Sequence, residues 1–159
     1  MLKILLFISL FLATGCVQNN MDLNKNSEIQ IESEVYQAFQ ELVVAARSLN
    51  VDTYLAFFDK KKFTSLNANG SVFHNLSDFE NFYRQQIPAL EKYNSLEFIN
   101  VKITVLNRST AILVNEYIAE VVLKSGDIVS AGGAGTQVWS KASGSWKLVN
   151  VSGSVKANG

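Results

Sequence analysis

The sequence predicts an α+β domain in which three N-terminal helices pack on a strongly curved antiparallel sheet. Apolar residues recur at helical spacing as far as Pro88, and after Asn94 they alternate with a period of two. Gly-containing turns at 125–127 and 142–145 join the alternating segments into a meander. Helices followed by such a meander pack together on one face of a single sheet.

The first helix is predicted over residues 28–48. Ser27 and Gln30 fit a capping box at its start, because their side chains can satisfy free N–H groups of the first turn. Apolar residues then recur at steps of three and four, which places one apolar stripe along the helix. The stripe consists of Ile31, Val35, Ala38, Phe39, Leu42, Val43, Ala46 and Leu49.

Two shorter helices are expected before the sheet. Asp52 can cap the first of them, and a capping box at 77–80 can start the second. A turn predicted at 66–71 separates the two. Pro88, the only proline, should end or kink the second of these helices, because proline lacks the N–H that a helix needs. Their apolar residues are Leu55, Phe57, Phe58, Phe79, Phe82, Tyr83 and Ile87.

The strand predicted at 110–124 indicates which side chains face the helices. One face carries Ala111, Leu113, Asn115, Tyr117, Ala119 and Val121. The other carries Ile112, Val114, Glu116, Ile118, Glu120, Val122 and Lys124. We expect the smaller and more apolar face to point inward, with both glutamates outside, although a register shift of one residue would reverse the faces.

Glycines interrupt the next predicted strand, which runs from Val129 to Lys141. They stand at 132, 133 and 135. Glycine inside a strand is typical of a bulge or a sharp bend. We therefore expect the sheet to curve strongly at this point.

The first sixteen residues predict a signal segment. Residues 4–13 are almost wholly apolar and, as a helix, cover about 15 Å, half of the ~30 Å core of a membrane. Such a run suits the core of a signal peptide. Ala13–Cys16, read Ala-Thr-Gly-Cys, resembles a bacterial lipobox, in which the cysteine carries the lipid. The alternative is an ordinary signal peptide that leaves Cys16 as a free thiol, a liability in an oxidising compartment.

The chain organisation follows from this N-terminus. We expect a lipoprotein signal peptide at 1–15, a lipidated Cys16 with a flexible Asn-rich tether at 16–27, and a folded domain at 28–156. The lipid would hold the domain at the cell envelope, on the periplasmic face of a membrane. In a Gram-negative host, Val17 after the cysteine resembles the context of sorting to the outer membrane.

Composition narrows the chemistry of the domain. With 14 basic and 14 acidic residues the formal net charge is zero, so no nucleic-acid partner is expected. Lys60–Lys62 is the only basic cluster, and we interpret it as a solvated loop. One histidine and one cysteine provide no transition-metal cluster. Neither a phosphate-binding loop nor a nucleophile elbow occurs, so we expect no metal and no cofactor.

Three segments carry a resemblance to a known superfamily. They are SLNVDTYLAFF at 48–58, NANGSVF at 67–73 and AGGAGTQVWSKASGSWKLVNVSGS at 131–154. In order and spacing they resemble the nuclear transport factor two-like, or SnoaL-like, superfamily of cone-shaped, cystatin-like domains. DKKKF at 59–63 departs from it, because many relatives carry an acidic pair there. The resemblance implies a conical pocket, which serves isomerases, cyclases and dehydratases in some members and binding in others.

We predict a pocket wall of apolar and aromatic residues with two neutral polar groups. Its residues are Phe39, Leu55, Phe58, Phe79, Phe82, Tyr83, Asn115 and Tyr117. The inward face of strand 110–124 offers no general base. The leading hypothesis is therefore a non-catalytic domain that binds a small apolar ligand or pairs its sheet with a second copy. Such a homodimer would cover the apolar residues of the outward face.

Two alternatives stay open. The first is an isomerase- or cyclase-type enzyme acting on a small apolar substrate. In it His74 or Asp59 would be the base, and Tyr117 or Asn115 would donate to the oxyanion. This hypothesis requires one of the two bases to lie within reach of Tyr117. The second alternative is a purely structural envelope protein in which side chains fill the cone.

Overall fold

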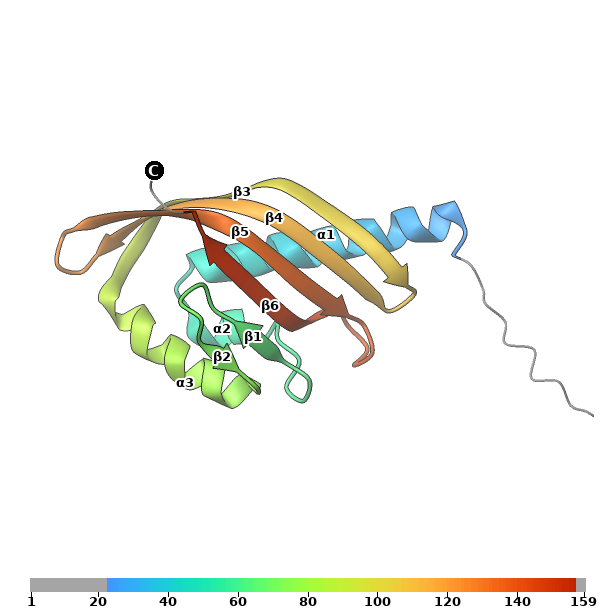
Figure 1. Ribbon diagram of the computed structural model, residues 1–159, viewed down its shortest axis with the longest axis horizontal. Helices are drawn as coiled ribbons and strands as arrows, with labels where there is room; N and C mark the ends of the chain where they lie inside the picture. Colours follow the sequence, from blue (N-terminus) through green and yellow to red (C-terminus); the bar gives the residue numbers. More distant parts are fainter. Residues whose placement is uncertain (1–22, 157–159) are drawn as a thin grey trace, which may run out of the picture.

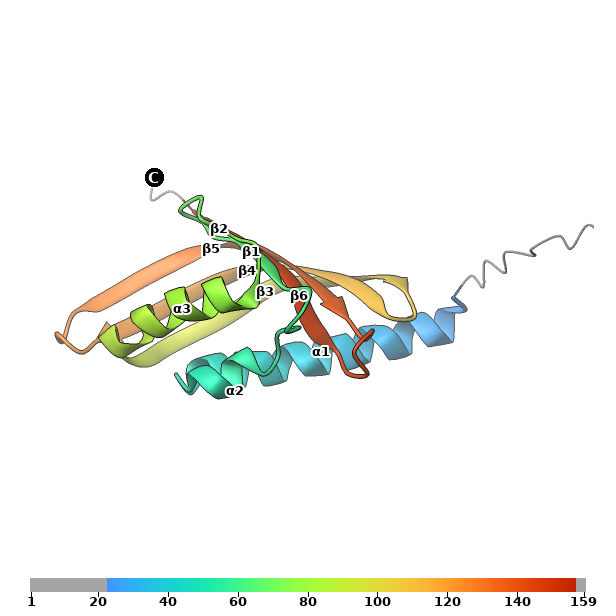
Figure 2. The same cartoon turned by 90° about the horizontal axis from the view of Figure 1, so that it is seen from below.

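The computed structural model describes residues 23–156, as a sheet that arches over three helices (Figure 1). The elements are α1 (Lys25–Arg47), α2 (Val51–Leu55), β1 (Thr64–Leu66), β2 (Val72–Phe73), α3 (Leu76–Gln86), the 3-10 helix η1 (Ile87–Ala89), β3 (Leu90–Asn107), β4 (Thr110–Leu123), β5 (Ile128–Ser140) and β6 (Lys147–Val155). The sheet has six strands in the order β2-β1-β6-β5-β4-β3. Figure 2 shows α1 and α2 along one side of it. The predicted α+β class with a curved antiparallel sheet is confirmed.

The prediction of three helices ahead of the sheet is correct only in part. α2 has five residues, and β1 and β2 come between it and α3. β1 pairs in parallel with β6 and antiparallel with β2. The predicted turn at 66–71 joins these two strands, with Gly70 at a φ of +86°. Strands of three and two residues are too short to produce a periodic pattern.

Each helix begins at an asparagine and not at the predicted cap. Asn24, Asn50 and Asn75 are the N-caps of α1, α2 and α3. Their side-chain oxygens accept hydrogen bonds of 2.9, 3.0 and 2.9 Å from the backbone N–H groups three residues further on. The predicted caps Ser27, Asp52 and Ser77 were wrong, because asparagine is as good an N-cap as serine or aspartate and stands ahead of each.

The predicted signal segment, Cys16 and the first part of the predicted tether lie outside the described residues. Within 23–156, α1 starts at Lys25, three residues before the start predicted from the sequence. None of the helices in this range is long and apolar enough to cross a membrane.

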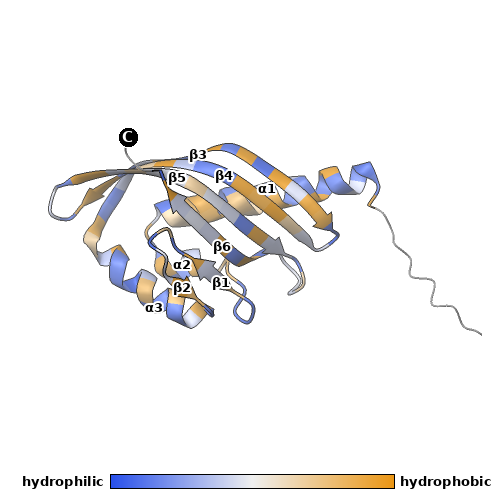
Figure 3. Cartoon of the chain, in the orientation of Figure 1, coloured by the Kyte–Doolittle hydropathy of each residue, from blue (hydrophilic) through white to orange (hydrophobic). Residues whose placement is uncertain are grey.

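Alternation along the strands sets the two faces of the sheet, and Figure 3 shows it as bands of opposite hydropathy. On β4, Ala111 and Leu113 are fully buried, whereas Ile118 is 52% exposed. The predicted inward face of this strand is therefore the face toward the helices. Gly126 and Gly144, at φ values of +92° and +98°, form the two predicted hairpin turns.

A bulge or a sharp bend was predicted at the β5 glycines, and the bulge was wrong. Gly132, Gly133 and Gly135 pair with β4 in unbroken register. Irregularities lie elsewhere: among them are one in β3 between Ile99 and Lys102 and one where β5 pairs with β6 beside Trp139, in which β6 carries the extra residue. The bulged part of β3 contains Asn100. Its φ of +53° is a conformation that asparagine tolerates better than most residues. The β5 glycines instead allow close approach of side chains from β4.

The core lies between α1 and the adjoining half of the sheet. α1 contributes a buried stripe, within which Val35 and Phe39 are fully buried. Trp139 and Leu148 meet it from the sheet and are also fully buried. At about 1.5–3 kcal/mol for each large apolar side chain removed from water, this cluster is the main source of stability.

Candidate functional site

The face of the sheet toward the helices, here called the inner face, consists of cross-strand rows. Two rows are closed by the helices: Ala111–Trp139–Leu148 and Leu113–Gln137–Val151. The rows beyond them on the same strands are Asn115–Gly135–Gly153, Tyr117–Gly133–Val155, Ala119–Ala131 and Val121–Val129. We call the first two rows the closed half and the others the open half. In the open half the exposure lies on β5 and β6, where Val129 is 46% exposed and Val155 is 60% exposed, whereas Asn115 and Ala119 on β4 are buried.

Asn115 stands at the boundary between the two halves. It is only 5% exposed, and its side-chain oxygen has no hydrogen-bond partner among the described residues. Leaving such an acceptor unpaired costs about 1–3 kcal/mol. A side-chain amide offers one acceptor and two donors, so it can satisfy either kind of polar group on a ligand.

Glycines opposite Asn115 and Tyr117 keep the sheet surface clear for these two side chains. A Cβ atom on Gly133 would lie 2.8 Å from the Tyr117 ring and hydroxyl and would overlap the Ser154 carbonyl. The Tyr117 ring therefore lies across the glycine, and its hydroxyl donates to the Ser154 carbonyl at 3.4 Å. A Cβ on the neighbouring Gly153 would meet nothing within 4 Å, which marks open space beside Asn115.

Aromatic rings of α2, of the segment after it and of α3 stack on one another as an aromatic wall that belongs to the core. Tyr54 stacks on Tyr83 with ring centroids 4.8 Å apart, and Phe58 stacks on Phe79 at 5.5 Å. Burial raises the pKa of both tyrosines well above the usual range. Their hydroxyls therefore stay protonated at neutral pH and cannot serve as bases.

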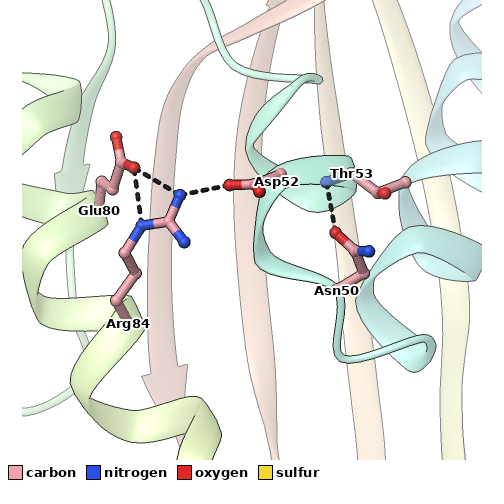
Figure 4. Close-up of polar contacts among 5 residues, drawn as sticks. All are labelled: Asn50, Asp52, Thr53, Glu80 and Arg84. Atoms are coloured by element: carbon pink, nitrogen blue, oxygen red, sulfur yellow. Dashed lines mark hydrogen bonds and ion pairs between the residues drawn. The ribbon is translucent and has the colours of Figure 1, made fainter.

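An exposed ion-pair cluster joins α2 to α3 on the outside of this aromatic wall (Figure 4). The Arg84 guanidinium donates to Glu80 at 2.8 Å and also contacts Asp52. Exposed pairs of this kind contribute little to stability, because water and salt screen them. Their main effect here is to fix α3 beside α2, which positions the Tyr54–Tyr83 stack.

The residues predicted for the pocket wall separate into three groups. Phe39, Leu55, Phe58 and Phe79 are buried members of the core, with at most 8% exposed. Phe82 and Tyr83 on α3 are half-buried, and Asn115 and Tyr117 lie in the open half.

Neither predicted base is paired with Tyr117 in this structure. The Asp59 carboxylate accepts backbone hydrogen bonds from Lys61 and Lys62 at 2.9 and 3.0 Å. The Asp59 N–H donates to Leu148, whose row crosses β4 at Ala111, six residues from Tyr117 along that strand. His74 is exposed and follows Phe73, whose ring packs on the core.

The glutamates of β4 lie on the opposite, outer face. Glu116 accepts from the Asn100 side chain at 2.8 Å and forms an ion pair with Lys156. Hydrogen bonds from Lys156 and then from Asn100 lower the pKa of Glu116. Glu120 accepts from the Asn94 side chain at 2.7 Å. Both carboxylates are therefore engaged away from the inner face.

Gln137 is an inner-face polar residue that the sequence analysis did not select. It is 7% exposed, and its side-chain oxygen accepts from the Trp139 indole at 3.0 Å. Alternation from Trp139 would have placed it inward. Among residues 23–156, no three His, Cys, Asp or Glu side chains gather in a way that could hold a metal.

The fold is an α+β domain with a curved antiparallel sheet, and the rows of its inner face on β4, β5 and β6 carry neutral side chains. The chain belongs to the SnoaL-like domain family, whose model matches residues 35–158. No curated protein matches the chain in sequence.

Solved structures share the fold at low sequence identity. A nuclear transport factor 2-like superfamily protein from Salmonella enterica serovar Typhimurium superposes with a TM-score of 0.71 at 18% identity, covering 82% of this chain and 94% of its own. The association domain of C. elegans calcium/calmodulin-dependent protein kinase II gives 0.65 at 20% identity, with 81% and 98% covered. A candidate scytalone dehydratase from Novosphingobium aromaticivorans gives 0.76 at 10% identity, with 84% and 89% covered.

Proposed function

We propose that the open half of the inner face binds a small, largely apolar ligand through Asn115, without catalysis. The observation that carries this proposal is the buried Asn115 oxygen without a partner, next to a surface that glycines keep clear. A ligand that enters between the sheet and α3 would give this amide a polar partner. Tyr117 and the exposed valines of the open half would contact its apolar part.

The chemistry of the interior supports binding over reaction. Proton transfer needs a base held near its working pKa. In the described rows of the open half every side chain is neutral, and Asp59 is bonded to Leu148 in the closed half. An isomerase- or cyclase-type enzyme remains the alternative, in line with the neighbour named as a candidate dehydratase.

Native mass spectrometry of the full chain purified from its own host tests the ligand proposal. We expect a small molecule to be retained by the unaltered protein and lost from Asn115→Leu. Asn94→Leu is the matched control, because Asn94 is exposed and bonds Glu120 on the outer face. A purely structural, filled cone predicts no retained molecule in any of the three. Equal retention by all three would also contradict the role of Asn115.

We also propose where in the cell the domain is located. A lipid on Cys16 would tether it to the cell envelope on the periplasmic face, as the lipobox resemblance implies. Intact-mass analysis of the mature chain should show a protein that begins at Cys16 and carries acyl groups. A free thiol at Cys16 would remove the anchor and leave the ligand proposal standing.

A second candidate function is self-association through the outer face. Ile99, Val114 and Ile118 lie there and are 39%, 40% and 52% exposed, in adjoining positions of β3 and β4. The C. elegans neighbour is named as an association domain. Light scattering on the full chain in neutral detergent should report a dimer that Ile118→Lys converts to monomer. A monomer before substitution would count against this function.

A further inference from the structure

A second concave region lies at the other end of β6 from Val155. It is a pocket of about 460 Å³ between the segment after α2 and the β5–β6 hairpin. Its lining includes Lys60, Lys61, Lys62 and Lys147, together with Asp59 and part of Phe58. The sequence predicts the three consecutive lysines to be a solvated loop, but the structure places them around a pocket with a fourth lysine.

Backbone pairing brings Lys147 to this cluster. The Leu148 N–H donates to the Phe57 carbonyl at 2.9 Å, and the Asp59 N–H donates back to Leu148 at 2.8 Å. The Lys147 ammonium group donates to the Ala56 carbonyl at 2.6 Å. The first residues of β6 are thereby fixed against the segment that leads into the three lysines.

Asp59 shapes the turn and does not pair with a lysine side chain. Its carboxylate accepts the backbone N–H groups of Lys61 and Lys62, which wraps the three lysines round the pocket. The ion pairs of the described residues involve Arg84, Lys141 and Lys156, and none involves the four pocket lysines. Four lysines against one aspartate leave a net charge of +3 on the lining.

Such a charge in a concave site attracts an anion of matching valence. A phosphate group carries up to two negative charges and several acceptor oxygens, so it can meet more than one ammonium group at once. A carboxylate offers one charge and two oxygens, so it neutralises less of the positive charge of the lining. Lysine is an established phosphate ligand that acts as a point charge.

We infer that the lysine pocket is a binding site for a phosphate group. A phosphate group occurs as a monoester with up to two charges in soluble phosphate compounds, and as a singly charged diester in the headgroup of phosphatidylglycerol; both offer acceptor oxygens to more than one lysine. This site is separate from the open half of the inner face, since it lies at the opposite end of β6. The inference therefore does not depend on the ligand proposed for Asn115.

Backbone amide NMR of the full chain in a neutral detergent tests the inference, with two kinds of probe. One arm titrates inorganic phosphate and glycerol 3-phosphate. The other adds phosphatidylglycerol to the micelles, with phosphatidylcholine as the neutral comparison. We expect saturable changes in the Lys61 and Lys62 signals in at least one arm, and the arm that responds identifies the source of the phosphate.

Charge-matched variants test whether the lysine pocket is the place where the phosphate probe binds. Lys61→Met with Lys62→Met removes two pocket charges and keeps the backbone bonds to Asp59, so the fold is retained. Lys102→Met with Lys124→Met removes two exposed charges elsewhere. We expect at least a tenfold loss of affinity in the first pair and little change in the second. No saturable change in either arm, or equal losses in both pairs, would overturn the inference.

Discussion

The closed and open halves of the inner face are made by the same strands and differ in what covers them. On β6, Leu148 in the closed half is fully buried, whereas Val155 in the open half is 60% exposed. On β4, fully buried Leu113 is followed on the same face by Asn115, whose oxygen has no partner. Alternation decides the face of a side chain, and the helices decide whether that face becomes core or accessible surface.

The side chains themselves also differ between the halves. In the closed half Trp139, Leu113 and Leu148 fill the space beneath α1. In the open half β5 contributes Gly133 and Gly135 at the equivalent positions. These glycines leave room for the Tyr117 ring over Gly133 and for the Asn115 side chain beside Gly135, whereas large side chains fill the equivalent positions of the closed half.

The largest expected effect is on stability, and it separates the two halves directly. Leu148→Ala should lower the free energy of unfolding by about 2–5 kcal/mol, because it leaves a cavity in the closed half. Val155→Ala should cost less than about 1 kcal/mol, since that side chain is already largely in water. Urea unfolding of the two variants measures both values. Similar losses would show that the open half is as tightly packed as the closed half.

A smaller loss of stability is expected from substituting a glycine of the open half that lies against other atoms. Gly133→Ala places a methyl group against the Tyr117 ring and the Ser154 carbonyl, so it should cost about 1–3 kcal/mol. Gly153→Ala, on the neighbouring strand, meets nothing and should be within about 0.5 kcal/mol of the unaltered protein. The same urea series measures the pair. Equal tolerance of both would mean that Tyr117 does not rest on Gly133.

Much of the fold could be predicted because its signals are local. The period of two in 110–124 reflects the geometry of a strand, and it placed Asn115 and Tyr117 on the inner face. Gly126 and Gly144 mark turns because their φ values favour glycine. The helix starts were missed because asparagine, serine and aspartate cap about equally well. β1 and β2 were missed because strands of three and two residues are too short to show an alternation of apolar and polar residues.

The site could be predicted less well because it depends on contacts between distant segments. Alternation puts Asn115 inward, but it does not say which strands the helices cover beyond that row: α1 contacts Phe98 and Leu96 on β3, whereas Val155 on β6 stays exposed. Phe58 and Phe79 have the aromatic character of a pocket wall, yet they pack on one another in the core. Lys147 lies far along the chain from Lys60–Lys62, and only the pairing of β6 with the segment after α2 joins them.

The closed half is also held from outside, by a clamp between α1 and the β5–β6 hairpin. The Glu34 carboxylate accepts from the Lys141 ammonium group at 2.7 Å and from the Trp146 indole at 2.9 Å. These hydrogen bonds, the one from Lys141 first, lower the pKa of Glu34 below its ordinary value of 4.5. No comparable link to α1 is present at the Val155 end of β6 within the described residues.

The smallest expected effect follows from the sign of that pKa change. Because the folded pKa of Glu34 lies below the unfolded value, the clamp contributes fully above about pH 4.5, and its contribution is lost as the pH falls through the folded pKa. The side chain is 32% exposed, so the contribution should be about 1 kcal/mol or less. Urea midpoints from pH 7 down to pH 3 should fall less steeply for Glu34→Gln than for the matched variant Glu32→Gln, an exposed position on the same helix. Identical slopes would show that the clamp does not stabilise the closed half, and that burial beneath α1 alone distinguishes it from the open half.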